Sequence, residues 1–251
     1  MATAPFTEST YGLAFETSSA IGSVALGCGD EIIETRELSG PRRHAVEFLP
    51  TVDAICKAHA IEPASVRRVY VSSGPGSFTG LRIGITAARM IAFANGASLV
   101  GVPTLDVIAQ NALFAGQDEN LTDPAQPPGC VVVVLDAKRG RVYAAAFVHK
   151  VNRYVPTCEP VEADPAQFLA DHASRGGPCA VMGEGVLYHR AAVEASGLPI
   201  LPELLYPPRA GTVYRLGLAR ARQGEFSKPR TLIPTYVRLP EAEEKWQQRH
   251  K

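Results

Sequence analysis

The 251-residue chain is 46% hydrophobic and 20% charged, and its 25 basic and 25 acidic side chains give a formal net charge of zero. This composition is typical of a globular protein, and the length suits two lobes of roughly 100–150 residues each. A neutral chain lacks the basic excess with which stand-alone nucleic-acid-binding proteins displace counterions, so we expect no strong RNA or DNA binding by the chain alone.

The cysteines are scattered, odd in number and without C-x-x-C spacing, at Cys28, Cys56, Cys130, Cys158 and Cys179. This pattern predicts reduced thiols rather than a disulfide framework or a zinc knuckle. The opening "MATAPFTEST" has neither the basic start nor the apolar core of a secretory signal, and no apolar run approaches the ~20 residues of a membrane span. We therefore expect a cytoplasmic protein with no membrane partner.

Short apolar runs between small residues predict strands, and apolar residues at helical spacing predict helices. In the first half these patterns predict three strands, a helix, a strand, a helix, a strand and a helix, at residues 11–19, 22–28, 31–38, 42–59, 67–73, 77–95, 98–102 and 104–115. The polar, proline-rich segment 116–129 predicts an exposed loop near a lobe boundary.

The second half repeats this order, with strands, a helix, a strand and a helix at 130–136, 141–150, 152–159, 164–173, 178–183 and 186–196. In each half the first strand ends on an acid, Glu16 or Asp136, which favours a duplicated topology. We expect a first lobe at 1–110, completed by a helix at 212–223, and a smaller lobe at 111–210. A tail at 224–251, with a mobile end, would follow.

The repeated order is similar to the duplicated actin-like, ribonuclease-H-like (ASKHA) fold of sugar kinases, actin and heat-shock chaperones. We therefore expect an α/β protein whose two lobes each hold a mixed sheet flanked by helices. In those relatives the turn after the first strand meets phosphate, and its acid helps to hold a metal ion. This resemblance suggests a vestigial nucleotide site, with weak ATP or ADP binding, at Glu16, Thr17, Ser18 and Asp136. In the alternative interpretation both acids only terminate strands and accept backbone hydrogen bonds.

Residues 74–84, "GPGSFTGLRIG", lack the lysine and hydroxyl of a G-x-x-x-x-G-K-[ST] phosphate loop. The turn is either a plain one capped by Ser77 or an anion site at a helix N-terminus. Gly80, Gly84 and Ala88 recur every four residues, so one helix face is nearly bare. Glycine inside a helix costs about 1 kcal/mol relative to alanine, which indicates close approach by a neighbour. That neighbour is either the chain's own helix 42–59 or a helix of another chain.

No histidine pair has the spacing of a zinc site and no serine lies in a G-x-S-x-G elbow, so we predict neither catalytic residues nor an intrinsic metal. Residues 74–92 followed by "VGVPTLDVIAQNA" (100–112) resemble the signature of the bacterial TsaB (YeaZ) family. Weaker matches agree in order and spacing at 13–26, 42–50, 133–145, 182–186 and 234–238.

The resemblance implies a non-catalytic dimerisation subunit of the machinery that makes N6-threonylcarbamoyladenosine (t6A) at position 37 of tRNAs reading codons that begin with A. It implies a heterodimer with the transferase TsaD, which the ATPase TsaE joins, and tRNA contact through the complex. The metal of the complex is expected on TsaD. Its H-x-x-x-H motif corresponds here to Thr104 and Ile108, which cannot replace two imidazoles.

In this family the TsaD contact is a four-helix bundle that uses the helices matched by 42–59 and 77–95. The partner interface that this implies is Ala45, Phe48, Leu49, Val52, Gly80, Gly84, Ile85 and Ala88. Without TsaD the same surface would allow a homodimer. The rival hypothesis is an actin-fold ATPase or kinase with Mg-ATP between its lobes, held by Glu16 and Asp136.

Overall fold

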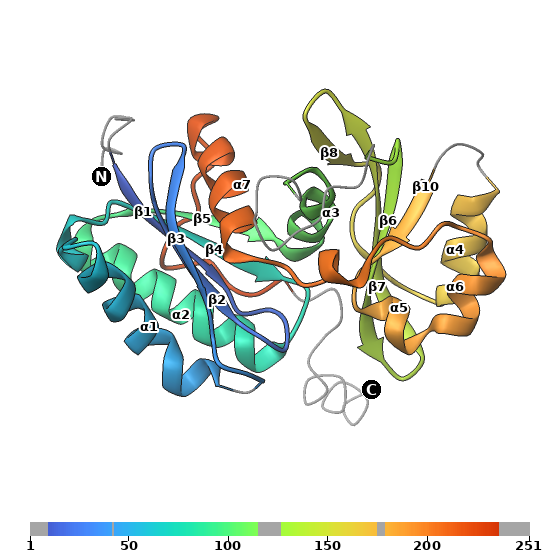
Figure 1. The fold of residues 1–251 in the computed structure, drawn as a ribbon, viewed down its shortest axis with the longest axis horizontal. Coiled ribbons are helices and arrows are strands. Elements are labelled where there is room, and N and C mark those ends of the chain that lie inside the picture. Colours follow the sequence, from blue (N-terminus) through green and yellow to red (C-terminus); the bar gives the residue numbers. More distant parts are fainter. Residues whose placement is uncertain (1–9, 42, 115–126, 175–178, 236–251) are drawn as a thin grey trace, which may run out of the picture.

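Two lobes lie side by side in a computed structural model of the chain, which describes residues 10–41, 43–114, 127–174 and 179–235 (Figure 1). Each lobe contains one mixed sheet flanked by helices, so the predicted fold class is confirmed. No helix in these ranges is both long and apolar enough to cross a bilayer.

The N-terminal lobe is built on a five-stranded sheet of order β3-β2-β1-β4-β5. Its elements are β1 (Tyr11–Glu16), β2 (Ser23–Cys28), β3 (Glu31–Glu37), α1 (His44–Ala58), β4 (Arg68–Gly74), α2 (Phe78–Asn95) and β5 (Ser98–Pro103). The next helix, α3 (Thr104–Phe114), packs Leu105, Ile108 and Ala109 into the core of the C-terminal lobe. The first three strands form an antiparallel meander, and β4 and β5 run parallel to β1. The central strand β1 therefore carries buried side chains on both faces of the sheet.

The two faces of this sheet have separate cores, because successive side chains of a strand point to opposite sides. Leu13 and Phe15 of β1 pack under α1 and α2, where the rings of Phe15 and Phe48 meet edge to face, 4.8 Å apart between centroids. Ala14 packs on the opposite side against α7 (Ala210–Arg222). As Figure 1 shows, α1 and α2 thus cover one face and α7 the other.

The C-terminal lobe repeats the same strand order, so the predicted duplication is confirmed. Its elements are β6 (Cys130–Lys138), β7 (Arg141–Lys150), β8 (Arg153–Pro156), β9 (Val161–Ala163), α4 (Pro165–Ala173), β10 (Cys179–Met182), α5 (Gly185–Tyr188) and α6 (Arg190–Ser196). The order β8-β7-β6-β10 matches β3-β2-β1-β4 of the first lobe. A single parallel bridge between Val181 and Ile200 stands where the first lobe has β5.

Two elements of this lobe differ from the predictions. The short strand β9, which pairs with β7, was not predicted. The helix predicted at 186–196 is two helices, because His189 leaves the helical conformation with φ −121° and ψ 33°.

The prediction of reduced thiols is wrong for one pair of cysteines, since Cys130 and Cys179 form a disulfide. They are paired residues at the starts of the parallel strands β6 and β10, with Cα atoms 4.3 Å apart. The two cysteines are 49 positions apart in the sequence, so their pairing follows from the sheet register rather than from a local motif.

The chain after α7 continues along the N-terminal lobe. The Ser227 backbone N–H donates to the Leu99 carbonyl at 2.8 Å, and the Thr235 N–H donates to the Ser73 carbonyl at 2.6 Å. Residues 225–235, here called the C-terminal strap, therefore cover part of the β5 edge. The predicted mobile end and most of the predicted loop at 116–129 lie outside the described residues.

Asp106 of α3 and Arg220 of α7 form an ion pair, with 3.2 Å between Oδ2 and Nη2. Burial raises the pKa of Asp106 to about 6 from 3.8; Arg220 opposes this increase and Glu159 adds to it. The folded protein therefore binds a proton that the unfolded chain releases, and stability falls as the pH rises from about 4 through about 6. We expect Asp106→Asn to flatten this part of the curve of unfolding free energy against pH. Urea unfolding of the wild type and of Asp106→Asn at several pH values measures this dependence. The prediction is contradicted if the unfolding free energies of the two proteins change in parallel with pH.

Candidate functional site

Helix α2 begins where β4 ends and forms one wall of the candidate site. The Ser77 hydroxyl caps it by accepting a hydrogen bond from the Gly80 N–H at 3.2 Å, and Gly96 ends it in a left-handed conformation with φ 62°. The helix presents two distinct faces, one to its own lobe and one to α1 and solvent.

The glycine face of α2 packs against its own lobe. A Cβ on Gly80 would lie 1.9 Å from the Thr17 carbonyl oxygen, and one on Gly84 would lie 2.2 Å from the Thr17 Oγ1. Ile85 and Ala88 are buried in the core of the same lobe. In the chain by itself these four predicted interface residues are therefore buried within their own lobe and do not lie on its surface. The spacing correctly indicated a close neighbour, but that neighbour is the turn after β1, neither α1 nor a second chain.

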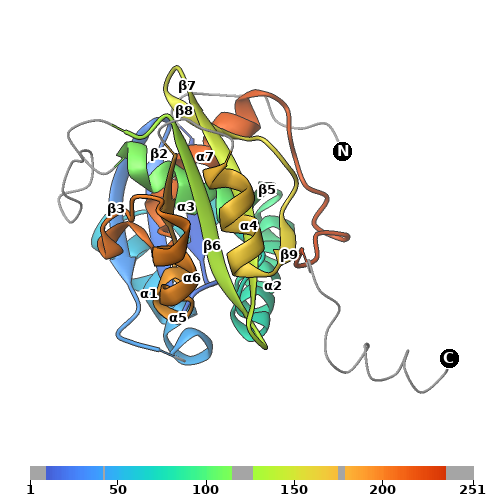
Figure 2. The ribbon, with the colours of Figure 1, turned by 90° about the vertical axis from the view of Figure 1, so that its right-hand side faces the viewer.

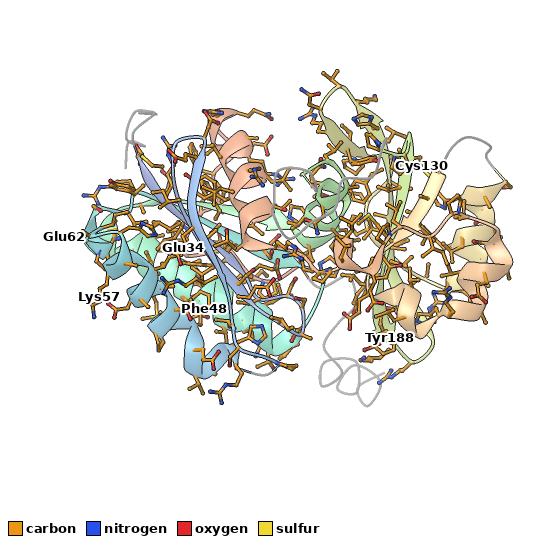
Figure 3. All side chains as sticks on the ribbon, in the orientation of Figure 1. Glu34, Phe48, Lys57, Glu62, Cys130 and Tyr188 are labelled. Atoms are coloured by element: carbon orange, nitrogen blue, oxygen red, sulfur yellow. A yellow bond between two sulfur atoms is a disulfide. The ribbon has the colours of Figure 1, made fainter. Side chains whose placement is uncertain are left out.

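Helix α1 divides its four predicted interface residues between core and surface. Phe48, labelled in Figure 3, and Val52 are buried beneath the helix, whereas Ala45 is exposed and Leu49 is 58% exposed. Of the eight predicted residues, only these last two offer side chains to a partner without rearrangement.

An apolar groove of about 900 Å³ lies between α1 and α2. Phe48 and Val52 line its floor, and Ala45 and Leu49 line its α1 wall. The α2 wall was not predicted; it includes Thr79, Ile83, Thr86 and Met90, together with the charged side chain of Arg82. The first four of these residues recur at intervals of four, three and four, which is the spacing of one helix face and could have identified the wall.

A second cavity, of about 770 Å³, is the cleft between the lobes. Ser18 and Ser77 line it from the N-terminal lobe, and Asp136 and Lys138 line it from the C-terminal lobe. The groove and the cleft share five lining residues, His44, Ala45, Phe78, Thr79 and Ile83. The two cavities therefore lie next to each other.

Glu16 does not reach this cleft. Its carboxylate is completely buried and accepts hydrogen bonds from the backbone N–H and the hydroxyl of Ser18, each at 2.5 Å, and from the Ser72 hydroxyl. Burial raises the pKa of Glu16, although the hydrogen bonds from Ser18 and Ser72 oppose the increase. Of the four residues suggested for a nucleotide site, the structure brings Ser18 and Asp136 to the cleft, while Glu16 and Thr17 lie behind its wall.

Asp136 faces the cleft, but other groups of the chain already occupy its carboxylate. Lys138 donates to it from its backbone N–H at 3.0 Å and from Nζ at 2.5 Å, and Nε2 of His189 lies 3.5 Å away. Burial acts to raise the pKa of Asp136, but the hydrogen bonds from Lys138 outweigh it and the pKa is lowered. This carboxylate is therefore satisfied within its own lobe.

The donor set does not fit a magnesium nucleotide. The two carboxylates that could hold the metal are the buried Glu16 and the occupied Asp136. Within the described ranges, no cluster of three or more His, Cys, Asp or Glu side chains could hold a metal ion. Thr104 lies at the cleft and Ile108 in the core of the C-terminal lobe, and neither side chain is a ligand for a metal.

The fold and these cavities define a class of protein. Two lobes with the same strand order, joined around a cleft, are the architecture of the duplicated actin-like, ribonuclease-H-like proteins. In this chain the open apolar surface lies beside the cleft, on the outer side of α1 and α2.

Comparison with known proteins gives the family. The model for TsaD, tRNA N6-adenosine threonylcarbamoyltransferase, matches residues 36–178. The Bacillus subtilis tRNA threonylcarbamoyladenosine biosynthesis protein TsaB is 27% identical over 93% of this chain and 96% of its own length. An uncharacterised Mycobacterium bovis protein is 31% identical over 80% of this chain and 78% of its own. The structure of YeaZ from Pseudomonas aeruginosa superposes with a TM-score of 0.72 at 21% identity, covering 90% of this chain and 99% of that one. The chain belongs to the TsaB (YeaZ) family, among proteins that carry the TsaD-type domain.

Proposed function

We propose that this protein is a scaffold subunit in the biosynthesis of t6A in tRNA and that its groove binds the TsaD transferase. The observation that carries the proposal is the apolar groove between α1 and α2. It is open to solvent, whereas the opposite faces of the same two helices are buried in the core of the lobe. Relatives of this chain that are named for t6A biosynthesis support the pathway.

The groove suits a helical partner. Its walls are two helices separated by an apolar floor, so helices of a second subunit can fill it and complete a four-helix bundle. Burial of apolar surface is the main driving force of such association. When TsaD is absent, the same groove would pair with a second copy of this chain.

The proposed role is non-catalytic. With Thr104 and Ile108 at the positions of the TsaD histidines, transfer of the threonylcarbamoyl group takes place on TsaD, with this chain holding the enzyme in its competent form. TsaE and the tRNA join through the complex. Because the substrate is tRNA, we place this function in the cytoplasm.

Size-exclusion chromatography with light scattering tests the proposal directly. We expect an equimolar mixture of this chain and the TsaD of the same genome to elute as one complex with the summed mass of both subunits. Separate elution of the two proteins at micromolar concentration would refute the proposal. The chain alone, run over a range of concentrations, is the control for self-association.

A further inference from the structure

The groove alone is small for a stable interface. Eighteen residues line it, and five of these, Leu13, His44, Phe48, Val52 and Ala87, are buried in the lobe, which leaves thirteen for a partner to cover. Specific protein–protein interfaces use roughly 20–30 residues on each side. A partner seated in the groove therefore needs further contact surface nearby.

Part of that surface lies along the two helices themselves, where Val46 and Phe93 are exposed, and part lies toward the cleft. The groove and the cleft share five lining residues, so the cleft that reaches the C-terminal lobe adjoins the groove. Exposed apolar side chains follow the same path. Phe78 stands at the start of α2, and Ile21 stands in the turn after β1, next to Ala20 of the cleft wall.

On the far side of the cleft, α5 exposes two more large apolar side chains, Leu187 (48%) and Tyr188 (57%). The Tyr188 hydroxyl donates to Oε1 of Glu184 at 3.2 Å, and the Lys138 ammonium lies 5.1 Å from the centre of the ring. Both Glu184 and Lys138 line the cleft. Tyr188 does not itself line the cleft, but it contacts these two residues that do.

The helices α1 and α2 of one lobe and α5 of the other all lie in the lower half of Figures 1 and 2, and Tyr188 is labelled in the lower part of the C-terminal lobe in Figure 3. Leu187 and Tyr188 are here called the C-lobe rim. Tyrosine is enriched among the residues that dominate interface energies, particularly where its orientation is already fixed.

We propose that the subunit seated in the groove reaches across the cleft and packs apolar side chains on the C-lobe rim, so that a single partner contacts both lobes. This proposal rests on the proposed function and identifies the partner as the TsaD-type subunit. A partner that contacts both lobes binds best to one interlobe arrangement. Its binding is therefore coupled to any change in that arrangement.

The test measures the affinity of the full chain for its TsaD by titration calorimetry. We expect Leu187→Glu and Tyr188→Ala each to weaken binding by about tenfold or more, because removing a fixed aromatic or apolar contact has effects of this size. The matched control is Val151→Glu, which changes a 90% exposed apolar side chain in the turn between β7 and β8 of the same lobe. Thermal melting of each variant confirms that it is folded.

The outcomes separate this proposal from the proposed function. Wild-type affinity in both rim variants, together with loss of binding in Leu49→Glu, would leave the groove as the interface and overturn the contact with the C-lobe rim. Absence of binding by the unmodified chain would overturn both proposals. Weakening in the rim variants, with Val151→Glu unchanged, would support the two-lobe contact.

Discussion

Gly80→Ala is expected to lower the free energy of unfolding by about 1–3 kcal/mol, although alanine is the better helix former. The added Cβ would lie 1.9 Å from the Thr17 carbonyl oxygen, which is a backbone atom and cannot rotate away. Relief requires that α2 or the turn after β1 move within a close-packed lobe. Urea unfolding followed by circular dichroism measures the loss.

The control for this variant is Gly40→Ala, since a Cβ at Gly40 would meet no atom within 4 Å. The free energy of unfolding of that variant should lie within about 0.5 kcal/mol of the wild-type value. If Gly80→Ala were as stable as Gly40→Ala, the close contact between α2 and Thr17 would be wrong, and the glycine face would again be available to a partner.

Leu49→Glu combined with Met90→Glu is expected to weaken TsaD binding by at least about 30-fold, which corresponds to about 2 kcal/mol. The two side chains lie on opposite walls of the groove and are 58% and 64% exposed. Two carboxylates there would be desolvated against apolar surface when the partner docks, and such burial is costly. Titration calorimetry with TsaD measures the loss of affinity.

The isolated double variant should remain folded, because both positions are exposed in the free chain. Glutamate is also a good helix former. Val151→Glu serves again as the control for an added charge at an exposed apolar position. Affinity unchanged from the wild type in Leu49→Glu/Met90→Glu would exclude the groove as the binding surface.

Much of the fold could be predicted from the sequence because its signals are local. The range of β7 was predicted without error, and α2 was placed with Ser77 as its cap, since apolar spacing and a capping hydroxyl are both readable in a short window. The strand β9 is only three half-buried or exposed residues long, which is too short for its Val-Glu-Ala alternation to indicate a strand. The break at His189 is a backbone change within a run whose apolar spacing is helical on both sides of it.

The site was only partly predictable because its contacts are long-range. The glycine spacing of α2 indicated a close neighbour, but a periodic pattern cannot identify which of several surfaces approaches it. Glu16 is the residue type expected for a cleft acid, yet Ser72, 56 positions away, helps to hold it inside the lobe. The disulfide has the same origin, since the pairing of β6 with β10 brings its cysteines together.

The C-terminal strap and α7 have a consequence for the order in which the protein can assemble during synthesis. The strands β1 to β5 emerge first from the ribosome, but the face that carries Ala14 and Tyr70 is covered only when α7 has been made. The β5 edge is covered later still, by Ser227. The core of the C-terminal lobe comes from the continuous stretch between Leu105 and Tyr206. This lobe can therefore fold before α7 has been made, while the N-terminal lobe is still incomplete. A nascent chain stalled before α7 would thus expose apolar sheet surface to chaperones, and removal of the strap would damage the lobe made first.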